Sequence, residues 1–333
     1  MGIQLSLLVT VVILLAGWVA GVLPFLKFIF GVILPYVALA VFAIGLIVRV
    51  LRWARSPVPF RITTTCGQEK SLPWIKQNKL DNPSSALGTL GRMALEVLFF
   101  RSLFRNTKAS LKDDRLVYSV DKWLWFFSLA FHWSFLIIFL RHFRFFTEPI
   151  PFFVGFLQDI DGFFQVGLPI IYITDVAILV ALTYLFLRRI FNAKVRIVSL
   201  PSDYFPLLLI LGIAVTGVLM RYFLKTDLVA VKEFAVSILS FQPISNELLN
   251  KLSPLFMIHF TFVCTLLIYF PMSKLVHLGG IFMSPTRNLA NNNRMKRHIN
   301  PWNPVVAVHT YEEYEDEFRE KMKAAGIPVE KEE

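Results

Sequence analysis

Six runs of apolar residues, each long enough to cross a membrane, constrain the fold of this chain. A bilayer core of roughly 30 Å needs about 20 helical residues to cross it. Hydrophobic residues make up 56% of the 333 residues, and charged residues only 17%. The runs are 3–23, 29–50, 119–141, 166–188, 204–224 and 254–277. They predict an all-α, polytopic bundle of six transmembrane helices.

Basic residues are unevenly distributed over the predicted loops, and this sets the orientation of the bundle. The segment 51–117 carries twelve Lys and Arg residues, and the loop 188–203 carries four more. Short basic loops stay on the cytoplasmic side, so we predict a multi-pass protein of the cytoplasmic (inner) membrane with both termini in the cytoplasm. The net charge of +11 then reflects topology. We find no soluble basic face with stacking aromatics, so no nucleic-acid partner is predicted.

Three segments outside the spans are predicted to be helical. The stretch 86–104 repeats apolar residues at helical spacing but is too charged to span, which favours an interfacial amphipathic helix. The outer stretch 228–241 is similar. Thr310 and Glu313 form a capping box that opens a charged helix, and Gly326 is placed to end it. That helix has too little apolar surface to fold alone, so we expect a soluble partner on the cytoplasmic face; a solvated tail is the alternative.

These features divide the chain into five segments. They are an additional N-terminal transmembrane helix (1–28), a second transmembrane helix (29–50), a cytoplasmic loop with the interfacial helix (51–117), a four-helix core (118–280), and a cytoplasmic tail that docks a partner subunit (281–333).

Four of the six histidines lie on two of the predicted spans. His132 and His142 are ten residues apart on one, and His259 and His277 are eighteen apart on the other. Neutral imidazole is the commonest side-chain metal ligand, and a haem iron inside a membrane can take one from each side. The sequence therefore predicts two haems b, each held by one histidine from each helix.

The pairing of these histidines follows from the topology. The two helices run antiparallel, which pairs His142 with His259 at an outer haem and His132 with His277 at an inner haem. The crossed combination would need parallel helices and is disfavoured. At about 1.5 Å per residue, the ligands are separated by roughly 15 Å on the first helix and roughly 27 Å on the second. The second helix must therefore tilt or kink, and Pro271 can supply the kink.

Polar residues near the helix ends are candidates for binding haem propionates and a quinone. The propionate candidates are Arg141, Arg144, Arg221 and Lys274. The candidates for a quinone or proton site are Glu148, Asp159, Asp161, Gln165 and Asp175. Asp175 is expected about ten residues into the fourth span, near mid-membrane, where a carboxylate is a functional candidate; an ion pair within the bundle is its alternative. The small residues Gly17 and Gly21 fit either a second membrane subunit or packing inside the bundle.

The histidine spacing, on antiparallel helices with two spans between them, resembles that of the respiratory nitrate reductase gamma (NarI-like) family of dihaem cytochromes b. The resemblance covers the region from 29 to 280 and leaves the first helix as an addition. That family places a quinone-binding lysine in the loop after the first two ligands, whereas residues 143–187 contain no lysine.

Two cytoplasmic segments resemble more narrowly the DsrM family, the membrane cytochromes of the DsrMKJOP complexes associated with sulfite reduction. They begin TTCGQEKSLPWIKQNKL in the loop and NPVVAVHTYEEYEDEF in the tail. This resemblance implies electron transfer between the menaquinone/menaquinol pool and DsrK, a cytoplasmic iron-sulfur subunit related to heterodisulfide reductase, in dissimilatory sulfur metabolism. Partners would then include membrane lipid and the other subunits of such a complex, a second membrane subunit among them.

Alternatives stay open at this point. The chain could be the cytochrome b subunit of another quinone-linked oxidoreductase, a haem-free transporter, or a structural membrane anchor. A transporter would show inverted repeats or broken half-helices at matched positions, and the sequence shows no such pairing. An anchor would not need four histidines at these positions.

Overall fold

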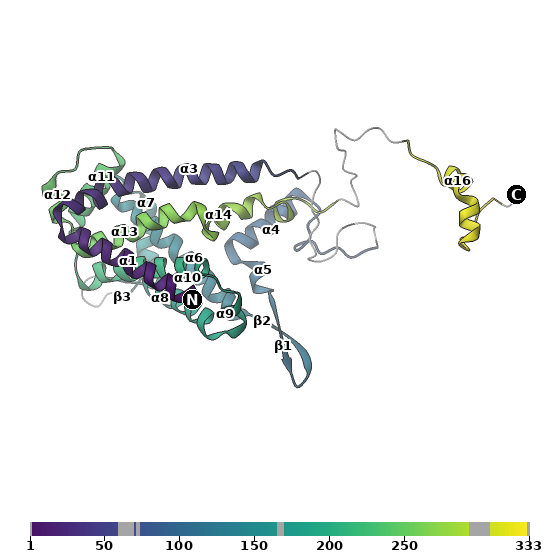
Figure 1. Ribbon diagram of the computed structural model, residues 1–333, viewed down its shortest axis with the longest axis horizontal. Helices are drawn as coiled ribbons and strands as arrows, with labels where there is room; N and C mark the ends of the chain where they lie inside the picture. Colours follow the sequence, from purple (N-terminus) through teal and green to yellow (C-terminus); the bar gives the residue numbers. More distant parts are fainter. Residues whose placement is uncertain (1, 59–69, 71–73, 165–169, 293–306, 332–333) are drawn as a thin grey trace.

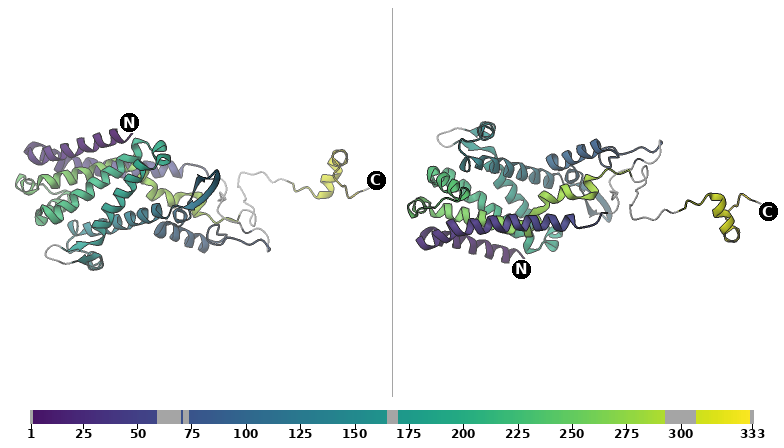
Figure 2. Two further views of the ribbon diagram at one scale, coloured as in Figure 1. Left: turned by 90° about the horizontal axis from the view of Figure 1, so that it is seen from below. Right: turned by 90° about the horizontal axis from the view of Figure 1, so that it is seen from above.

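The structure is a computed structural model, and it describes residues 2–58, 70, 74–164, 170–292 and 307–331. Most of the described chain is helical, as predicted, and the helices up to residue 292 gather into one elongated bundle (Figures 1 and 2). Two short antiparallel ribbons are also present, so the chain is not entirely α-helical.

Within the described residues, five helical stretches are long and apolar enough to cross a membrane, by length and composition. They are α1 (Gly2–Val22); α2, η1 and α3 in continuous succession (Pro24–Phe28, Ile29–Ile33 and Leu34–Ala54); α6 with η2 (Lys122–Arg141 and His142–Phe145); α10 with η3 (Pro201–Val218 and Leu219–Phe223); and α13 with η4 (Pro254–Tyr269 and Phe270–Met272). The sequence predicts six. The remaining prediction, 166–188, falls on α8 (Ile173–Phe191), which is helical but carries Asp175, Arg188 and Arg189 near its ends.

The packing of the long helices is organised around α13. Helix α13 packs closely against α1, α3 and α10, while α6 packs closely against α8, which in turn packs against α10. A Cβ on Gly17 would stand 2.8 Å from Cα of Ile258, and one on Gly21 would stand 2.5 Å from Cα of Pro254. These glycines let α1 approach the backbone of α13. The small-residue face therefore packs inside this bundle.

The end of the bundle that carries α7, α11 and α12 is called the outer end here, after the predicted topology (Figure 1). The elements there are α7 (Phe152–Asp161), a ribbon of β3 (Gly162–Phe164) and β4 (Ile171–Tyr172), α11 (Leu228–Leu239) and α12 (Asn246–Lys251). Asp227 caps α11 by accepting from the backbone N–H of Val229 and Ala230. Helix α11 confirms the helix predicted over 228–241.

The opposite, inner end carries the predicted interfacial helix. It forms as α4 (Ala86–Phe99) and α5 (Arg101–Phe104), joined at Phe100. We call residues 86–104 the inner strap. Ser85 caps α4, because its hydroxyl accepts from the backbone N–H of Gly88. The other short elements at this end are α9 (Ala193–Val198), η5 (Lys274–Val276), α14 (His277–Gly280), η6 (Ile281–Met283) and α15 (Pro285–Asn288).

A β-hairpin follows the inner strap, and the sequence analysis missed it. Strand β1 (Thr107–Lys112) pairs antiparallel with β2 (Arg115–Val120). The two turn residues, Asp113 and Asp114, both have positive φ, the conformation of a two-residue hairpin turn that Asp tolerates. The hairpin delays the start of α6 to Lys122, where Asp121 provides the cap.

The tail forms the predicted capped helix. Thr310 accepts from the backbone N–H of Glu313, the Glu313 side chain accepts from that of Thr310, and α16 (Tyr311–Ala324) follows. Gly326, with φ of +71°, lies just past the end of the helix. The predicted capping box and the predicted helix stop at Gly326 are both confirmed.

Candidate functional site

Helix α6 holds its two histidines through its own backbone. The Nδ1 atoms of His132 and His142 lie 2.7 Å from the carbonyl oxygens of Ser128 and Ile138, each four residues earlier. His132 lies within the helix, whereas His142 is its C-terminal cap and begins η2. Each imidazole can therefore donate its Nδ1 proton one helical turn back.

The other two histidines are held in different ways. Nδ1 of His259, on α13, lies 2.9 Å from Oγ1 of Thr216 on α10. The Thr216 hydroxyl donates its own hydrogen to the carbonyl oxygen of Gly212, at 2.7 Å, so it accepts from His259. Nδ1 of His277 lies 2.8 Å from the carbonyl oxygen of Lys274.

All four imidazoles thus have an acceptor at Nδ1. A histidine that donates from Nδ1 has an unprotonated Nε2, and hydrogen bonding at one ring nitrogen is how proteins orient a histidine that ligates a metal through the other. The bonds of His132, His142, His259 and His277 share this polarity. The donor set fits metal ligation through four Nε2 atoms.

The structure brings the four histidines together in the antiparallel combination. The ring centroids of His132 and His277 are 6.0 Å apart. His142 and His259 lie near the outer ends of α6 and α13, where the nearby Phe145 and Phe260 pack against the same core cluster. Since a metal bonds an imidazole nitrogen at about 2 Å, two rings on opposite sides of one ion have centroids about 6 Å apart. The inner pair fits one ion between its rings.

The prediction that 254–277 forms one kinked helix is wrong. Helix α13 ends at Tyr269, η4 ends at Met272, and Ser273 is extended, with ψ of 177°. Pro271 has no N–H to continue the helix, and it packs on α3, where a Cβ on Gly45 would stand 2.8 Å from its ring. His277 begins the separate helix α14. The break removes the need for one rigid helix to match the spacing of the ligands on α6.

A flat group needs room between the helices that hold it. Among the described residues, α6 and α13 are not one of the closely packed helix pairs, although both belong to the bundle. The core between them is apolar, since Phe135 and Ile138 of α6 pack with Leu266 of α13 around the buried Leu182. No group of three or more His, Cys, Asp or Glu side chains in the described segments could hold a metal ion; a haem takes only axial ligands from protein.

A buried polar network lies beside His142 at the outer end, and it joins four of the predicted residues. Arg141 contacts Asp175 at 2.8 Å and Asp161 at 3.2 Å, with side chains 9%, 11% and 5% exposed. Asp175 also accepts from the Tyr222 hydroxyl at 2.8 Å and lies 3.9 Å from Arg221. Both guanidinium groups stack on the ring of Tyr172. Two cations and two carboxylates balance, which makes their burial tolerable.

This network corrects the expected position of Asp175. Helix α8 begins at Ile173, so Asp175 lies in its first turn and not ten residues into a span. A carboxylate in a first turn also interacts favourably with the helix dipole. The ion-pair alternative for Asp175 is therefore what the structure contains.

The other predicted residues have different surroundings. Lys274 pairs with Asp203 at 2.7 Å. Glu148 pairs with Lys232 of α11, and both line an outer groove of about 490 Å³ together with Arg144. Asp159 is exposed on α7. Gln165 lies outside the described residues.

Comparison with known proteins places the chain in a family. The family model of the nitrate reductase gamma subunit matches residues 94–298, a stretch that contains all four histidines. The chain belongs to the nitrate reductase gamma subunit family. The match begins at residue 94, so α1 to α3 lie outside it.

Two relatives of this chain are archaeal proteins. The chain is 49% identical over 281 residues to the "Hdr-like menaquinol oxidoreductase cytochrome b-like subunit" of Archaeoglobus fulgidus, covering 83% of this chain and 84% of the relative. It is 48% identical over 276 residues to the protein of the same name from Archaeoglobus profundus, covering 81% and 82%.

Several side chains that shape the site in this family member were missed at the sequence level. Thr216 is the partner of His259, Tyr222 closes the Arg–Asp network, and Lys232 enters the outer groove from α11. Each comes from an element distant in sequence from the residue it contacts. Of these three residues, only Lys232 could have been proposed from the sequence, because it is a cation on a helix that was predicted at the outer surface.

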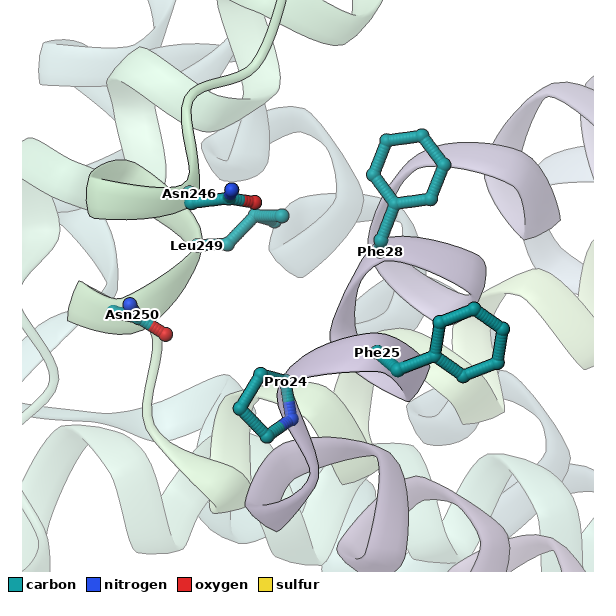
Figure 3. Close-up of a pocket in the computed structure, with 6 residues that line it drawn as sticks. All are labelled: Pro24, Phe25, Phe28, Asn246, Leu249 and Asn250. Carbon is teal, nitrogen blue, oxygen red and sulfur yellow. The ribbon is translucent and has the colours of Figure 1, made fainter.

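A second groove at the outer end has no connection to the histidines. It lies between α2 and α12 and is lined by Pro24, Phe25, Phe28, Asn246, Leu249 and Asn250 (Figure 3). The buried Lys27 next to it donates to the carbonyl oxygens of Leu249 and Leu252, at 3.3 and 3.2 Å. These bonds hold α2 against the C-terminal end of α12. The groove is the space left between the two helices.

Proposed function

We propose that this chain is a dihaem cytochrome b subunit that carries electrons between menaquinol at the outer end and a cytoplasmic iron-sulfur partner at the inner end. His142 and His259 would hold the outer haem b, and His132 and His277 the inner one. A bound haem supplies a one-electron carrier at each pair. The single observation that carries the proposal is the shared Nδ1 bonding of four histidines, of which His132 and His277 meet ring to ring.

The topology we propose has six spans and both termini in the cytoplasm. Helix α8 would be the sixth span, with Asp175 at its outer end and Arg188 and Arg189 at its inner end. Paired charges at the end of a span are compatible with crossing, because Asp175 is neutralised by Arg141, and Arg188 pairs with Asp121 at 3.0 Å. This arrangement keeps the basic segments 51–117 and 188–203 on one side.

We place the quinol site in the outer groove. Phe145 lines this groove and also lies against the His142 ring, with centroids 5.8 Å apart. The groove adds apolar side chains from α11 and the ion pair of Glu148 with Lys232. Ligand sites typically combine apolar walls with a few polar groups that orient the ligand. Lys232 would supply the lysine that the loop 143–187 lacks, and Glu148 would accept a quinol proton.

The proposed partners of the haem propionates are basic side chains at the two ends of the bundle. Nε of Arg141 is buried and has no hydrogen-bond partner among the described residues, while the other nitrogens of this guanidinium bind Asp161 and Asp175. That atom is available to a propionate of the outer haem. Arg144 and Arg221 are further candidates there. Lys274, which lies three residues before His277, would serve the inner haem.

The partner is proposed from the names of the relatives and from the cytoplasmic segments. The relatives are called subunits of an Hdr-like menaquinol oxidoreductase. An iron-sulfur subunit of the DsrK type, related to heterodisulfide reductase, would dock on the inner end and the tail helix α16. The other subunits of a DsrMKJOP-type complex in dissimilatory sulfur metabolism would complete the assembly. A complex with another quinone-linked oxidoreductase is the second candidate, because the relatives' name specifies menaquinol and not sulfite reduction.

Haem counting on purified protein tests the proposal. The reduced protein should show cytochrome b absorption bands with two haems per chain, and His259→Ala and His277→Ala should each lose one. His309→Ala, which alters a tail histidine paired with Glu313, should keep both. A colourless protein, as expected for a transporter or an anchor, would contradict the proposal.

A further inference from the structure

Phe100 has an unusual backbone conformation at the centre of the inner strap. Its φ and ψ are 51° and 46°, the left-handed region that bulky L-residues seldom adopt and that glycine adopts freely. Phe100 ends α4 and caps α5. An aromatic residue where glycine would suffice indicates that its side chain has a use.

The Phe100 ring lies against a proposed haem ligand. Its centroid is 4.8 Å from that of the His132 imidazole, and the two planes are at 88°. Phe131 contacts the same imidazole, also at 4.8 Å. Edge-to-face packing of this kind fixes the orientation of both rings. Two phenyl rings therefore define the plane of His132.

Two tryptophans of α6 hold the strap at this place. The indole Nε1 of Trp125 donates to the carbonyl oxygen of Phe99 at 2.7 Å, and that of Trp133 donates to the carbonyl oxygen of Leu98 at 3.0 Å. These acceptors immediately precede Phe100. The last turn of α4 is thus bonded to the helix that bears His132 on both sides of that histidine.

The strap also bonds the segment that follows His277. Arg92 of α4 donates to the carbonyl oxygen of Thr286 at 3.3 Å. Arg287 pairs with Glu96 at 3.3 Å and donates to the hydroxyl of Ser102 at 3.2 Å. Arg287 lies ten residues after His277. The inner strap therefore connects the two chain segments that supply the inner histidine pair.

We propose that Phe100 is a positioning residue for the inner haem: held by the strap, it fixes the plane of the His132 imidazole and keeps water from that ligand. This inference rests on the proposed haem ligation and adds a residue that acts through one of the ligands. The ligands of the outer pair are bonded by Ile138 and Thr216 at the other end of the bundle from the strap. Substitution of Phe100 should therefore affect one haem only.

The expected effects have defined signs. Loss of the ring frees His132 to rotate, and the angle between two axial imidazole planes determines the low-spin ferric EPR signal. Water that enters stabilises the more highly charged ferric state, so the reduction potential of the inner haem should fall. A residue that served only folding would change haem content without selecting one signal.

The test uses the full-length protein with two haems bound. Phe100→Leu keeps an apolar side chain, and Phe100→Gly also relieves the left-handed backbone. The matched control is Phe104→Leu, because Phe104 is in the same strap and packs on Trp125 at 4.9 Å. Each variant is measured by EPR and by potentiometric titration, with the outer haem as internal reference.

Both Phe100 variants should shift the inner EPR signal and lower the inner midpoint potential, while the outer signal stays in place and Phe104→Leu leaves both in place. Unchanged inner signals in haem-loaded Phe100 variants would overturn the positioning role alone. Equal shifts in the Phe104→Leu control would also overturn it. Absence of haem from the unsubstituted protein would overturn the proposed function and this inference together.

Discussion

The outer and inner histidine pairs are built differently, although both use imidazoles bonded at Nδ1. His142 and His259 are fixed by bonds inside the bundle, next to a charge-balanced Arg–Asp network. His132 and His277 depend on chain outside the spans, because His277 follows a helix break and is exposed, and His132 is packed by the strap. The outer site should therefore resist changes in the loops, whereas the inner site should respond to them.

The largest difference is expected from the buried charge network. Arg141→Met leaves Asp161 and Asp175 buried with too little positive charge, which should destabilise the protein by about 3 to 5 kcal/mol. Lys274→Met is the matched control at the inner end, because Lys274 is 66% exposed in its pair with Asp203, and such pairs contribute about 0 to 1 kcal/mol. Denaturation in detergent measures both. Equal losses of stability in the two variants would contradict the claim that the outer end depends more strongly on its buried charges.

A smaller and more local effect is expected at His259. Thr216→Val removes the acceptor at Nδ1 with little change in shape, and loss of such a bond typically weakens metal binding roughly 10- to 100-fold. The outer haem should then dissociate more readily while the inner haem is retained. Thr265→Val is the control, since the Thr265 hydroxyl bonds the carbonyl oxygen of Thr261 on the same helix. Haem transfer to an acceptor protein reports both rates, and equal rates would refute the role of Thr216.

The outer groove should affect turnover and not haem content. Lys232→Met removes one charge-assisted hydrogen bond to the proposed quinol, which should slow menaquinol-dependent haem reduction on the order of tenfold. Lys225→Met is the control, because Lys225 is an exposed outer lysine that does not line the groove. Stopped-flow absorbance gives the rates. If both variants reduce at the rate of the unsubstituted protein, the quinol site lies elsewhere.

Changes in the tail should leave both histidine pairs unaffected. The effect expected there is therefore the smallest, and it is confined to the tail. Backbone N–H groups of Glu330 and Lys331 donate to Glu315 and hold the pKa of that carboxyl below its usual range. A depressed carboxyl pKa stabilises α16 above the unfolded-state pKa, and this contribution is lost as pH falls through the folded pKa. Acidification should reduce hydrogen-exchange protection of 311–331 while haem content stays constant. Protection that persists in acid would show that Glu315 contributes little.

Local signals predicted local structure in this chain. The capping box at Thr310, the stop at Gly326 and helical structure within 86–104 each depend on neighbours within a few residues, and all are present. The hairpin around Asp113 and Asp114 was not among the predicted elements. An Asp–Asp pair between alternating residues was the available signal.

Features that depend on tertiary contacts could not be predicted in the same way. Pro271 indicated a kink, but whether a proline bends or ends a helix depends on what packs around it, here Gly45 of α3. Arg141 was assigned to a propionate and Asp161 and Asp175 to a quinone or proton site, since nothing in the sequence shows that α6, α7 and α8 meet at one place. The contact of His132 with His277 could be predicted because antiparallel helices fix the order of depths, whereas the ligand pairing itself stays a prediction.

Haem counting in two double variants tests the antiparallel pairing most directly. Replacing His142 and His259 together with Ala removes both ligands of one site, so one haem per chain should remain. Replacing His142 and His277 together removes one ligand from each site, so none should remain. The opposite result, one haem in the second variant and none in the first, would contradict the account and establish the crossed pairing.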